Sequence, residues 1–456
     1  MCSILFSTKY SSSTDLNDVN YYNQFRGPDD TVINHDETNN LLFIHNLLSI
    51  TGTHQTQPFI KDNIVCLYNG EIYNYKEFGN YNSDGECLIE LYKKYGEKFT
   101  TKLDGEFAIT LLDITNDKLI ISSDIFKTKP LFYCDSDGIG TSTYSEPLRK
   151  IGHNNVLKFP PNTTRVYQFS TNKLINEFNV YEFDLNQHKN TFDDWILSFE
   201  ESIQKRTNNT DKNIFLGLSS GFDSGAIVCE LLKQNIKFKA YSVMGGQAHD
   251  DTVSLKDRHN LIKNSKNGTF EILIRNNDIR ETHRNLLEKN TEEFIWTVES
   301  SSTIDRNGNL YKERMKLSDE RGAAWISFIC SEAVKDNNQK IYLSGQGADE
   351  IFSDYGFNGK KHSAHSNFGG LFPNDLKEIF PWNSFYNSTM ESYLAKEEYA
   401  SGMWGIETRY PFLDKKVVQE FLWLVPELKN KNYKSVLHEY FTNNNFPFDA
   451  GRKVGF

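Results

Sequence analysis

The chain has 456 residues, of which 38% are hydrophobic and 14% aromatic. This length suggests two or three domains, and the apolar content excludes a disordered chain. The net charge of -11, from 50 basic and 61 acidic residues, argues against a broad nucleic-acid-binding surface.

The six cysteines form no CxxC pair and no Cys/His cluster with zinc spacing. We therefore expect reduced thiols rather than a disulfide framework. The first residues lack the basic segment and long apolar core of a signal peptide. No apolar run reaches the ~18 residues typical of a membrane span. These features predict a cytoplasmic protein with no nucleic-acid or membrane partner.

The first part of the chain is predicted to be rich in β-structure. The expected elements are strands at residues 2–8, 64–68, 107–112 and 119–123 and a helix at residues 84–95. The last two strands flank Thr115-Asn116-Asp117 and are expected to form a hairpin. Asn69-Gly70, which follows the second strand, is a typical turn pair.

Strands and helices alternate in the second part. We expect strands at residues 214–218, 238–243 and 341–343 and helices at residues 224–232 and 324–334. This alternation predicts a parallel sheet with helices on its faces, and ligands of such sheets bind at the carboxyl ends of the strands.

Two polar segments interrupt this pattern. The stretch at residues 171–190 is polar and Asn-rich, and we place the domain boundary near its end. The charged stretch at residues 291–321 is expected to be an irregular, mobile loop.

Cys2 is the first candidate catalytic residue. Removal of Met1 would place its thiol beside its own α-amino group, whose pKa is near 8. That amine can serve as the general base, as in N-terminal nucleophile enzymes. On position alone, the alternative of a small buried strand residue is favoured.

Further motifs follow Cys2 over about 150 residues, and their order and spacing matter more than any one of them alone. They are Arg26-Gly27-Pro28-Asp29, Asn69-Gly70-Glu71-Ile72-Tyr73-Asn74, Ser83-Asp84-Gly85-Glu86, Leu103-Asp104-Gly105-Glu106-Phe107-Ala108 and the run from Asp124 to Tyr133. Here the chain resembles the class II glutamine amidotransferase domain.

The resemblance implies a four-layer αββα N-terminal nucleophile fold in which Cys2 attacks the amide of glutamine. Asn69 and the Gly70 N–H would hold the oxyanion, and Glu71 and Asp84 would bind the α-amino group. The alternative for Asn69-Gly70 is a plain hairpin turn.

One departure from this family affects the expected donor. Leu47 stands where an Arg would pair with the α-carboxylate of glutamine. Losing a charge-assisted pair weakens binding. We therefore expect weak glutamine binding unless Arg26 or another cation substitutes.

The second constellation is Leu218-Ser219-Ser220-Gly221-Phe222-Asp223-Ser224, between a predicted strand and a predicted helix. Small residues let backbone N–H groups approach an anion, and the helix N-terminus adds its dipole. Asp223 is a candidate magnesium ligand. The segment resembles the pyrophosphate loop of ATP pyrophosphatases. Its alternative interpretation is a tight strand–helix turn.

The third constellation, Ser344-Gly345-Gln346-Gly347-Ala348-Asp349-Glu350, resembles the asparagine synthetase signature. The run from Glu407 to Asp414 and then Lys434 follow in the order of that family. The resemblance implies that Asp349 is a second Mg²⁺ ligand and that Lys434 neutralises charge on the phosphates. It implies ATP contacts from Leu218, Ser219, Ser220, Gly221, Asp223, Ser224, Val243, Ser344 and Gly345.

Two of the departures from the synthetase pattern bear on the acceptor. Gln346 replaces the Glu thought to take a proton from ammonia, and an amide cannot act as that base. Phe222 replaces the usual Leu. Both changes favour a specialised acceptor, whereas the remaining motifs favour the ordinary one.

The combined expectation is a glutaminase domain at residues 1–188 and an α/β ATP-pyrophosphatase-like synthetase domain at residues 189–456. The resemblance implies that Mg-ATP activates a carboxylate as an acyl-adenylate, which ammonia from glutamine or solution converts to an amide. Aspartate is the expected acceptor. The alternatives are another carboxylate, such as a uronic acid or a natural-product intermediate, and a regulatory homologue without turnover. By analogy with the family, a homodimer is one expectation for its assembly.

Overall fold

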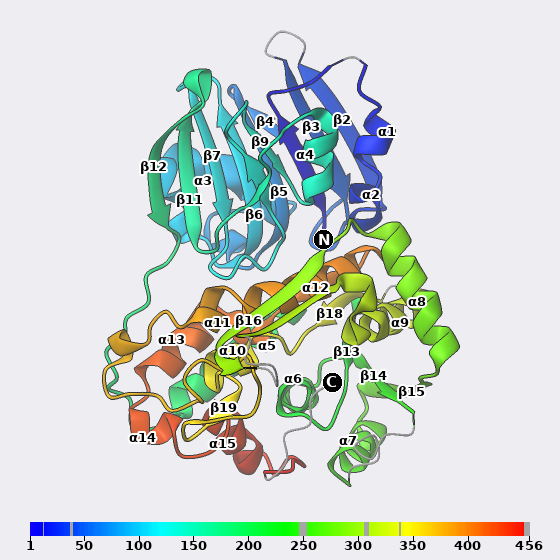
Figure 1. The fold of residues 1–456 in the computed structure, drawn as a ribbon, viewed down its shortest axis with the longest axis vertical. Coiled ribbons are helices and arrows are strands. Elements are labelled where there is room, and N and C mark those ends of the chain that lie inside the picture. Colours follow the sequence, from blue (N-terminus) through cyan, green and yellow to red (C-terminus); the bar gives the residue numbers. More distant parts are fainter. Residues whose placement is uncertain (12, 37–39, 246–252, 305–309, 337–338, 451–456) are drawn as a thin grey trace.

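The computed structural model describes residues 1–11, 13–36, 40–245, 253–304, 310–336 and 339–450. Two antiparallel sheets fill the upper half of Figure 1, and a parallel sheet with its covering helices fills the lower half. The N-terminus lies where the two halves meet. No helix of the described residues is long and apolar enough to cross a membrane.

The upper half is a sandwich of two six-stranded sheets. In spatial order, the first contains β10 (Leu157–Lys158), β8 (Phe132–Cys134), β9 (Gly140–Ser142), β1 (Ser3–Ser7), β3 (Leu41–Leu47) and β2 (Asp30–Asp36). The second contains β12 (Lys173–Asn179), β11 (Thr163–Gln168), β7 (Lys118–Ser123), β6 (Gly105–Asp113), β5 (Ile64–Ile72) and β4 (Phe59–Lys61). Alternate side chains of both sheets, including Ile4, Phe6, Leu67 and Ile121, form the core between them.

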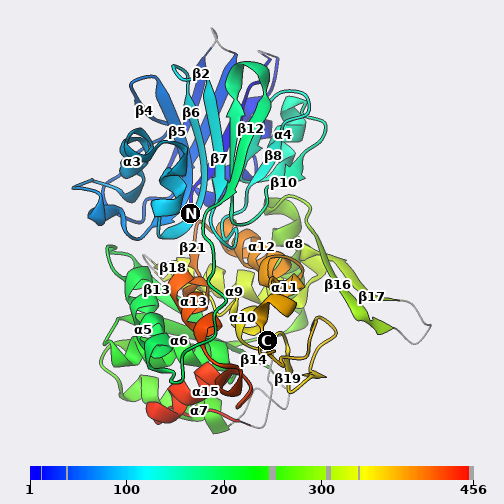
Figure 2. The same cartoon turned by 90° about the vertical axis from the view of Figure 1, so that its left-hand side faces the viewer.

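Helices cover the outer faces of this sandwich. Leu88 and Leu91 of α3 (Cys87–Tyr95) pack in the core on one side, and Leu148 of α4 (Ser145–Ile151) packs with strands of the other sheet. Figure 2 shows the resulting helix–sheet–sheet–helix order. The αββα architecture expected from the resemblance is present. Two short helices, α1 (Leu16–Val19) and α2 (Asn23–Arg26), complete this half.

The expected turn at Asn69-Gly70 is wrong, because β5 continues through both residues to Ile72. The continuation depends on Gly70, which has a φ of 146°. A Cβ there would lie 1.9 Å from the carbonyl oxygen of Glu106 on β6. Glycine thus permits the close approach of two strands where the dipeptide alone suggests a turn.

The lower half is built on a five-stranded parallel sheet, as predicted. Its order is β15 (Gly268–Ile274), β14 (Phe238–Met244), β13 (Asn213–Gly217), β18 (Gln339–Leu343) and β21 (Glu407–Arg409). The helices are α5 (Asp193–Thr207), α6 (Phe222–Lys233), α7 (Val253–Asn264), α8 (Asn277–Asn290), α9 (Arg321–Lys335), α10 (Ala348–Phe352), α11 (Asn383–Tyr386), α12 (Thr389–Gly402), α13 (Lys415–Trp423), α14 (Pro426–Lys429) and α15 (Ser435–Asn443).

Two polar segments are more regular than expected. β12 lies within the polar, Asn-rich stretch at residues 171–190 and pairs with β11 as an edge strand. The stretch predicted to be an irregular loop contains β16 (Ile295–Ile304) and β17 (Leu310–Lys316), which form an antiparallel pair. Figure 2 shows this pair extending from the body. Edge and protruding strands carry polar residues, so hydrophobic periodicity does not identify them.

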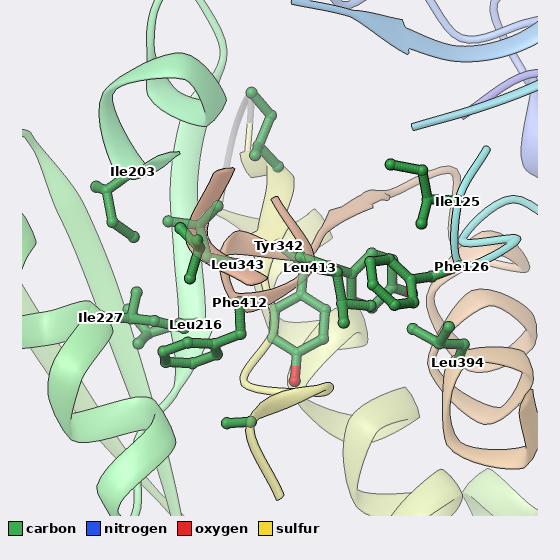
Figure 3. Close-up of a cluster of buried hydrophobic side chains, with 14 of the residues drawn as sticks. Ile125, Phe126, Ile203, Leu216, Ile227, Tyr342, Leu343, Leu394, Phe412 and Leu413 are labelled. Carbon is green, nitrogen blue, oxygen red and sulfur yellow. The ribbon is translucent and has the colours of Figure 1, made fainter. Parts of the chain in front are cut away.

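The two halves share one hydrophobic core. Figure 3 shows Ile125 and Phe126 of the upper half in a cluster with Leu394 and Leu413 of the lower half. The rings of Phe126 and Phe385 have centroids 5.6 Å apart. Burial of this apolar surface favours a fixed arrangement of the halves.

Phe199 on α5 is a sensitive test of the lower core. It is fully buried, with its ring stacked 5.5 Å from Trp195 and 5.1 Å from Phe412 between ring centroids. We expect Phe199→Ala to lower the free energy of unfolding by roughly 3–5 kcal/mol. The control is Leu197→Ala on the same helix, where the side chain is 51% exposed and a change within about 0.5 kcal/mol is expected. Urea unfolding followed by tryptophan fluorescence measures both; equal effects would contradict this packing.

Candidate active sites

A small pocket of about 40 Å³ surrounds Cys2 at the end of the sandwich that faces the lower half. Its lining includes four predicted site residues: Cys2, Gly70, Glu71 and Asp84. It also includes Leu47 and, from the other half of the chain, Glu407. The structure therefore brings these separate motifs together at one point.

Cys2 is not an activated nucleophile while Met1 precedes it. Burial raises the pKa of its thiol to about 11, an effect that the nearby Met1 amine only partly offsets. The Met1 amine is buried and lies 3.3 Å from a carboxylate oxygen of Glu407. Burial lowers the pKa of this amine, and Glu407 partly opposes the change. Removing Met1 would transfer the terminal amine to Cys2, beside its own thiol.

Asn69 and Gly70 lie on β5, which pairs directly with β6 in the sheet. The Asn69 side chain is fully buried, and its Nδ2 and Oδ1 have no hydrogen-bond partner among the described residues. A buried amide without partners is unusual. Its free N–H groups make Asn69 a candidate oxyanion donor, although it does not line the pocket in the Met1-bearing chain.

Glu71 and Asp84 occupy the acidic side of the pocket. Asp84 accepts hydrogen bonds from the Tyr68 hydroxyl at 2.5 Å and the Ile72 N–H at 2.9 Å. Burial nevertheless raises the pKa of Asp84 to about 6. Glu71 accepts a hydrogen bond from Thr51 and forms a 2.9 Å ion pair with Arg409. A cationic α-amino group would be stabilised by these carboxylates.

The structure places Arg26 outside this pocket. Its guanidinium is fully buried and donates to the carboxylate and the backbone carbonyl of Glu398, both at 2.7 Å. Arg26 is thus committed to the contact between the halves, which does not favour its predicted contact with glutamine. The charged side chains that line the described pocket are all acidic, and Leu47 offers no cation in their place.

The second site is a cleft of about 280 Å³ at the carboxyl ends of β13 and β18. These strands are neighbours, yet the chain continues from β13 to β14 on one side and from β18 to β21 on the other. The cleft therefore lies where the strand order reverses, the usual ligand position in such sheets. It is lined by seven predicted residues: Ser219, Gly221, Asp223, Ser224, Gly345, Asp349 and Lys434.

Lys434 joins the two candidate metal ligands. Its ammonium is 2.5 Å from Asp223 Oδ1 and 3.0 Å from Asp349 Oδ1. Burial opposes its charge, but these two carboxylates raise the pKa of Lys434 well above the ordinary value. Two carboxylates that converge on one cation fit the oxygen ligands that Mg²⁺ prefers. Gly345 allows the convergence, since a Cβ there would lie 2.8 Å from the Asp223 Cβ.

The loop after β13 is arranged by local hydroxyls and by a buried arginine that sequence reasoning missed. Arg258 donates to the carbonyls of Ser219 and Gly221, both at 2.7 Å. A Cβ on Gly225 would meet its guanidinium at 2.6 Å. A glycine inside a helix costs about 1 kcal/mol. Gly225, inside the predicted helix at residues 224–232, was therefore the sequence signal that another group approaches the helix closely there.

Four of the predicted ATP contacts do not line the cleft: Leu218, Ser220, Val243 and Ser344. Leu218 and Ser344 are buried behind it. Phe222 packs against the rings of Tyr433, Phe441 and Phe448, so its size is used in an aromatic cluster. Gln346 lines the cleft and donates a hydrogen bond to Glu397, a second residue absent from the sequence prediction.

Comparisons with known proteins find a matching domain in each half of the chain. A glutamine amidotransferase domain model matches residues 1–182, and an asparagine synthase model matches residues 383–445. A putative asparagine synthetase [glutamine-hydrolyzing] 1 of Methanocaldococcus jannaschii is 25% identical over 91% of this chain and 76% of its own length. Asparagine synthetases [glutamine-hydrolyzing] of Triphysaria versicolor and Oryza sativa are each 27% identical over 89% of this chain.

The chain spans 66% and 65% of the length of these two plant relatives, so each is longer than this chain. The two family models lie in the order that the motifs predicted, and the second contains Lys434 and the run from Glu407 to Asp414. Together with the matches over most of the sequence, they show that the chain is similar to glutamine-hydrolysing asparagine synthetases in both halves, as the motifs predicted.

Proposed function

We propose that this protein amidates a carboxylate in an ATP-dependent reaction that passes through an acyl-adenylate, with nitrogen from glutamine or free ammonia. One observation carries the proposal: Asp223, Asp349 and Lys434 meet in a cleft at the reversal of the strand order. The glutamine amidotransferase domain in the same chain supplies a source of ammonia. The proposed division is a glutaminase domain at residues 1–188 and a synthetase domain at residues 189–456.

In the proposed glutaminase reaction, the Cys2 thiol gives its proton to its own α-amine and attacks the amide carbon of glutamine. Asn69 and the Gly70 N–H stabilise the oxyanion. Glu71 and Asp84 hold the substrate's ammonium group. Ammonia leaves first, and water then releases glutamate from the thioester.

In the proposed synthetase reaction, the loop from Ser219 to Ser224 and the N-terminus of α6 bind the phosphates of ATP. Lys434 stabilises the charge that develops on them as a carboxylate oxygen displaces pyrophosphate. Asp223 and Asp349 are the residues that would hold Mg²⁺, which neutralises phosphate charge when it is bound. Nitrogen then attacks the acyl carbon, and AMP leaves.

Aspartate is the acceptor that we propose first, because the matched relatives are named asparagine synthetases. A different carboxylate is the second candidate. Two residues of the cleft lining favour it: Gln346 at the position of the expected base, and Phe222, which belongs to an aromatic cluster. ATP–pyrophosphate exchange without a nitrogen donor, measured over a panel of carboxylates, tests the proposal. Exchange that depends on one carboxylate supports the proposal, and a lack of exchange with every carboxylate would contradict it.

The reactivity of the Cys2 thiol should depend on the removal of Met1. We expect mass spectrometry to find Cys2 at the N-terminus of the active enzyme and a glutamine-analogue electrophile to label it. A form that keeps Met1 should remain unlabelled at neutral pH, because burial holds its thiol pKa at about 11. Cys2→Ala should lose glutamine hydrolysis and keep ammonium-supported synthesis. Full glutaminase activity in a chain that retains Met1 would refute the assignment.

Asp223→Asn and Asp349→Asn should each lower carboxylate-dependent ATP–pyrophosphate exchange about a hundredfold or more, since each removes a charge that would hold the metal. Glutamine hydrolysis should change less than about twofold, because the Cys2 pocket includes neither residue. The control is Asp319→Asn, a surface carboxylate that is 49% exposed and pairs with Arg284. Near-normal exchange in either cleft variant would show that the metal assignment is mistaken.

Leu47 should make free ammonia the better nitrogen donor. We expect ammonium salts to support synthesis better than glutamine, with activity rising from about pH 7 to pH 9 as neutral ammonia becomes abundant. Leu47→Arg should lower the KM for glutamine roughly ten- to a hundredfold, the value of a charged pair. Leu47→Met, which preserves volume, should leave it unchanged. A low KM in the unmodified enzyme that Leu47→Arg does not alter would contradict this prediction.

A further inference from the structure

Gln346 lines the cleft at the position where the asparagine synthetase signature carries a carboxylate, and a carboxylate lies directly beside it. The Gln346 amide donates a hydrogen bond to Glu397 Oε1 at a distance of 3.0 Å. Glu397 lies on α12, 51 residues later in the chain, and it also lines the cleft. The carboxylate that is missing from the loop after β18 is therefore present on the adjacent wall.

The environment of Glu397 suits a proton acceptor. The residue is 3% exposed; the Tyr342 hydroxyl lies near its carboxylate, but Oε2 has no hydrogen bond within the usual distance and angle to a described residue. Buried carboxylate oxygens are normally satisfied, so an open one inside a substrate cleft is a functional candidate. Burial raises the pKa of Glu397 above its ordinary value, while Lys396, Gln346 and Tyr342 partly offset this effect. A raised value makes a carboxylate a stronger base near neutral pH.

Gln346 then has a positioning function. Its N–H group occupies Oε1 of Glu397 and leaves Oε2 as the open oxygen. An amide at position 346 also adds no second negative charge beside Glu397, whereas a glutamate there would place two carboxylates in contact. Two buried carboxylates in contact cannot both ionise readily. The amide and the relocated carboxylate are thus chemically complementary.

We propose that Glu397 is the general base for the nitrogen nucleophile of the amidation step, in place of a carboxylate at position 346. This inference rests on the proposed function. As the nitrogen lone pair forms the C–N bond, the C–O bond to AMP breaks and its electron pair leaves with the phosphate oxygen. The proton released by nitrogen passes to Glu397 Oε2. The amide, AMP and one proton are the products.

Glu397→Gln tests the proposal, because it removes the base and preserves the shape of the side chain. We measure two activities of the full-length enzyme: carboxylate-dependent ATP–pyrophosphate exchange and amide formation from ammonium over a pH range. The variant should keep exchange within about threefold, and its amide formation should fall roughly 10²- to 10⁴-fold, the range typical of a lost general base. Its rate should rise more steeply with pH than that of the unmodified enzyme, as hydroxide and free ammonia replace the base.

Three further variants make the result specific. Gln346→Glu combined with Glu397→Gln should recover part of the lost amidation, since it returns a carboxylate to the other wall. Glu397→Asp should retain more activity than Glu397→Gln. Glu391→Gln makes the same chemical change on α12, where Glu391 pairs with Lys127 and Lys158 outside the cleft, and should leave both activities unchanged.

Two outcomes overturn the proposal. Amide formation at the normal rate in Glu397→Gln excludes Glu397 as the base. A proportional loss of exchange and amide formation assigns it to adenylation or to the folded structure instead. The proposed function fails separately, if the unmodified enzyme shows no carboxylate-dependent exchange.

Discussion

A group of buried ion pairs between the two halves of the chain is the interaction on which both candidate sites depend. Arg26 and Lys129 of the sandwich pair with Glu398 of α12. Two arginines of the lower half also pair with carboxylates of the sandwich: Arg409 pairs with Glu71, and Arg206 pairs with Glu106. These side chains are almost fully buried, so removing one partner leaves an uncompensated charge at a cost of about 3–5 kcal/mol. The pairs therefore fix the relative position of the halves.

The same ion pairs reach into both sites. Arg409 binds Glu71 and Glu407, and both carboxylates line the pocket around Cys2. Burial disfavours the charge of Glu407, but Arg409 and the Met1 amine outweigh this effect and lower its pKa. Within α12, Glu398 belongs to the ion pairs and its neighbour Glu397 lines the cleft at the ends of β13 and β18. One helix thus connects the contact between the halves to the proposed site of amidation.

Motifs predicted the fold class and the regions of the two sites, because short apolar strands, strand–loop–helix boundaries and clustered small residues are local signals. The parallel sheet and the hairpin of β6 and β7 are confirmed.

Long-range burial could not be predicted in the same way. Lys396, Glu397 and Glu398 are three consecutive charged residues, a run typical of a solvent-exposed segment, yet all three are buried. Arg26 was predicted to bind glutamine from the resemblance, and its motif gives no sign of its partner Glu398, which is 372 residues away in the sequence. The continuation of β5 through Gly70 likewise depends on a neighbouring strand.

Buried charges make the two halves one cooperative unit, and each half carries its own probe. All six tryptophans lie at position 195 or later, so their fluorescence reports on the lower half. Cys66 is fully buried on β5 and reports on the sandwich through its reaction with a thiol reagent. The direct measurement is the urea dependence of both signals in the full-length protein. One common midpoint is the predicted result. Labelling of Cys66 at urea concentrations where the tryptophan signal is still native would contradict the claim.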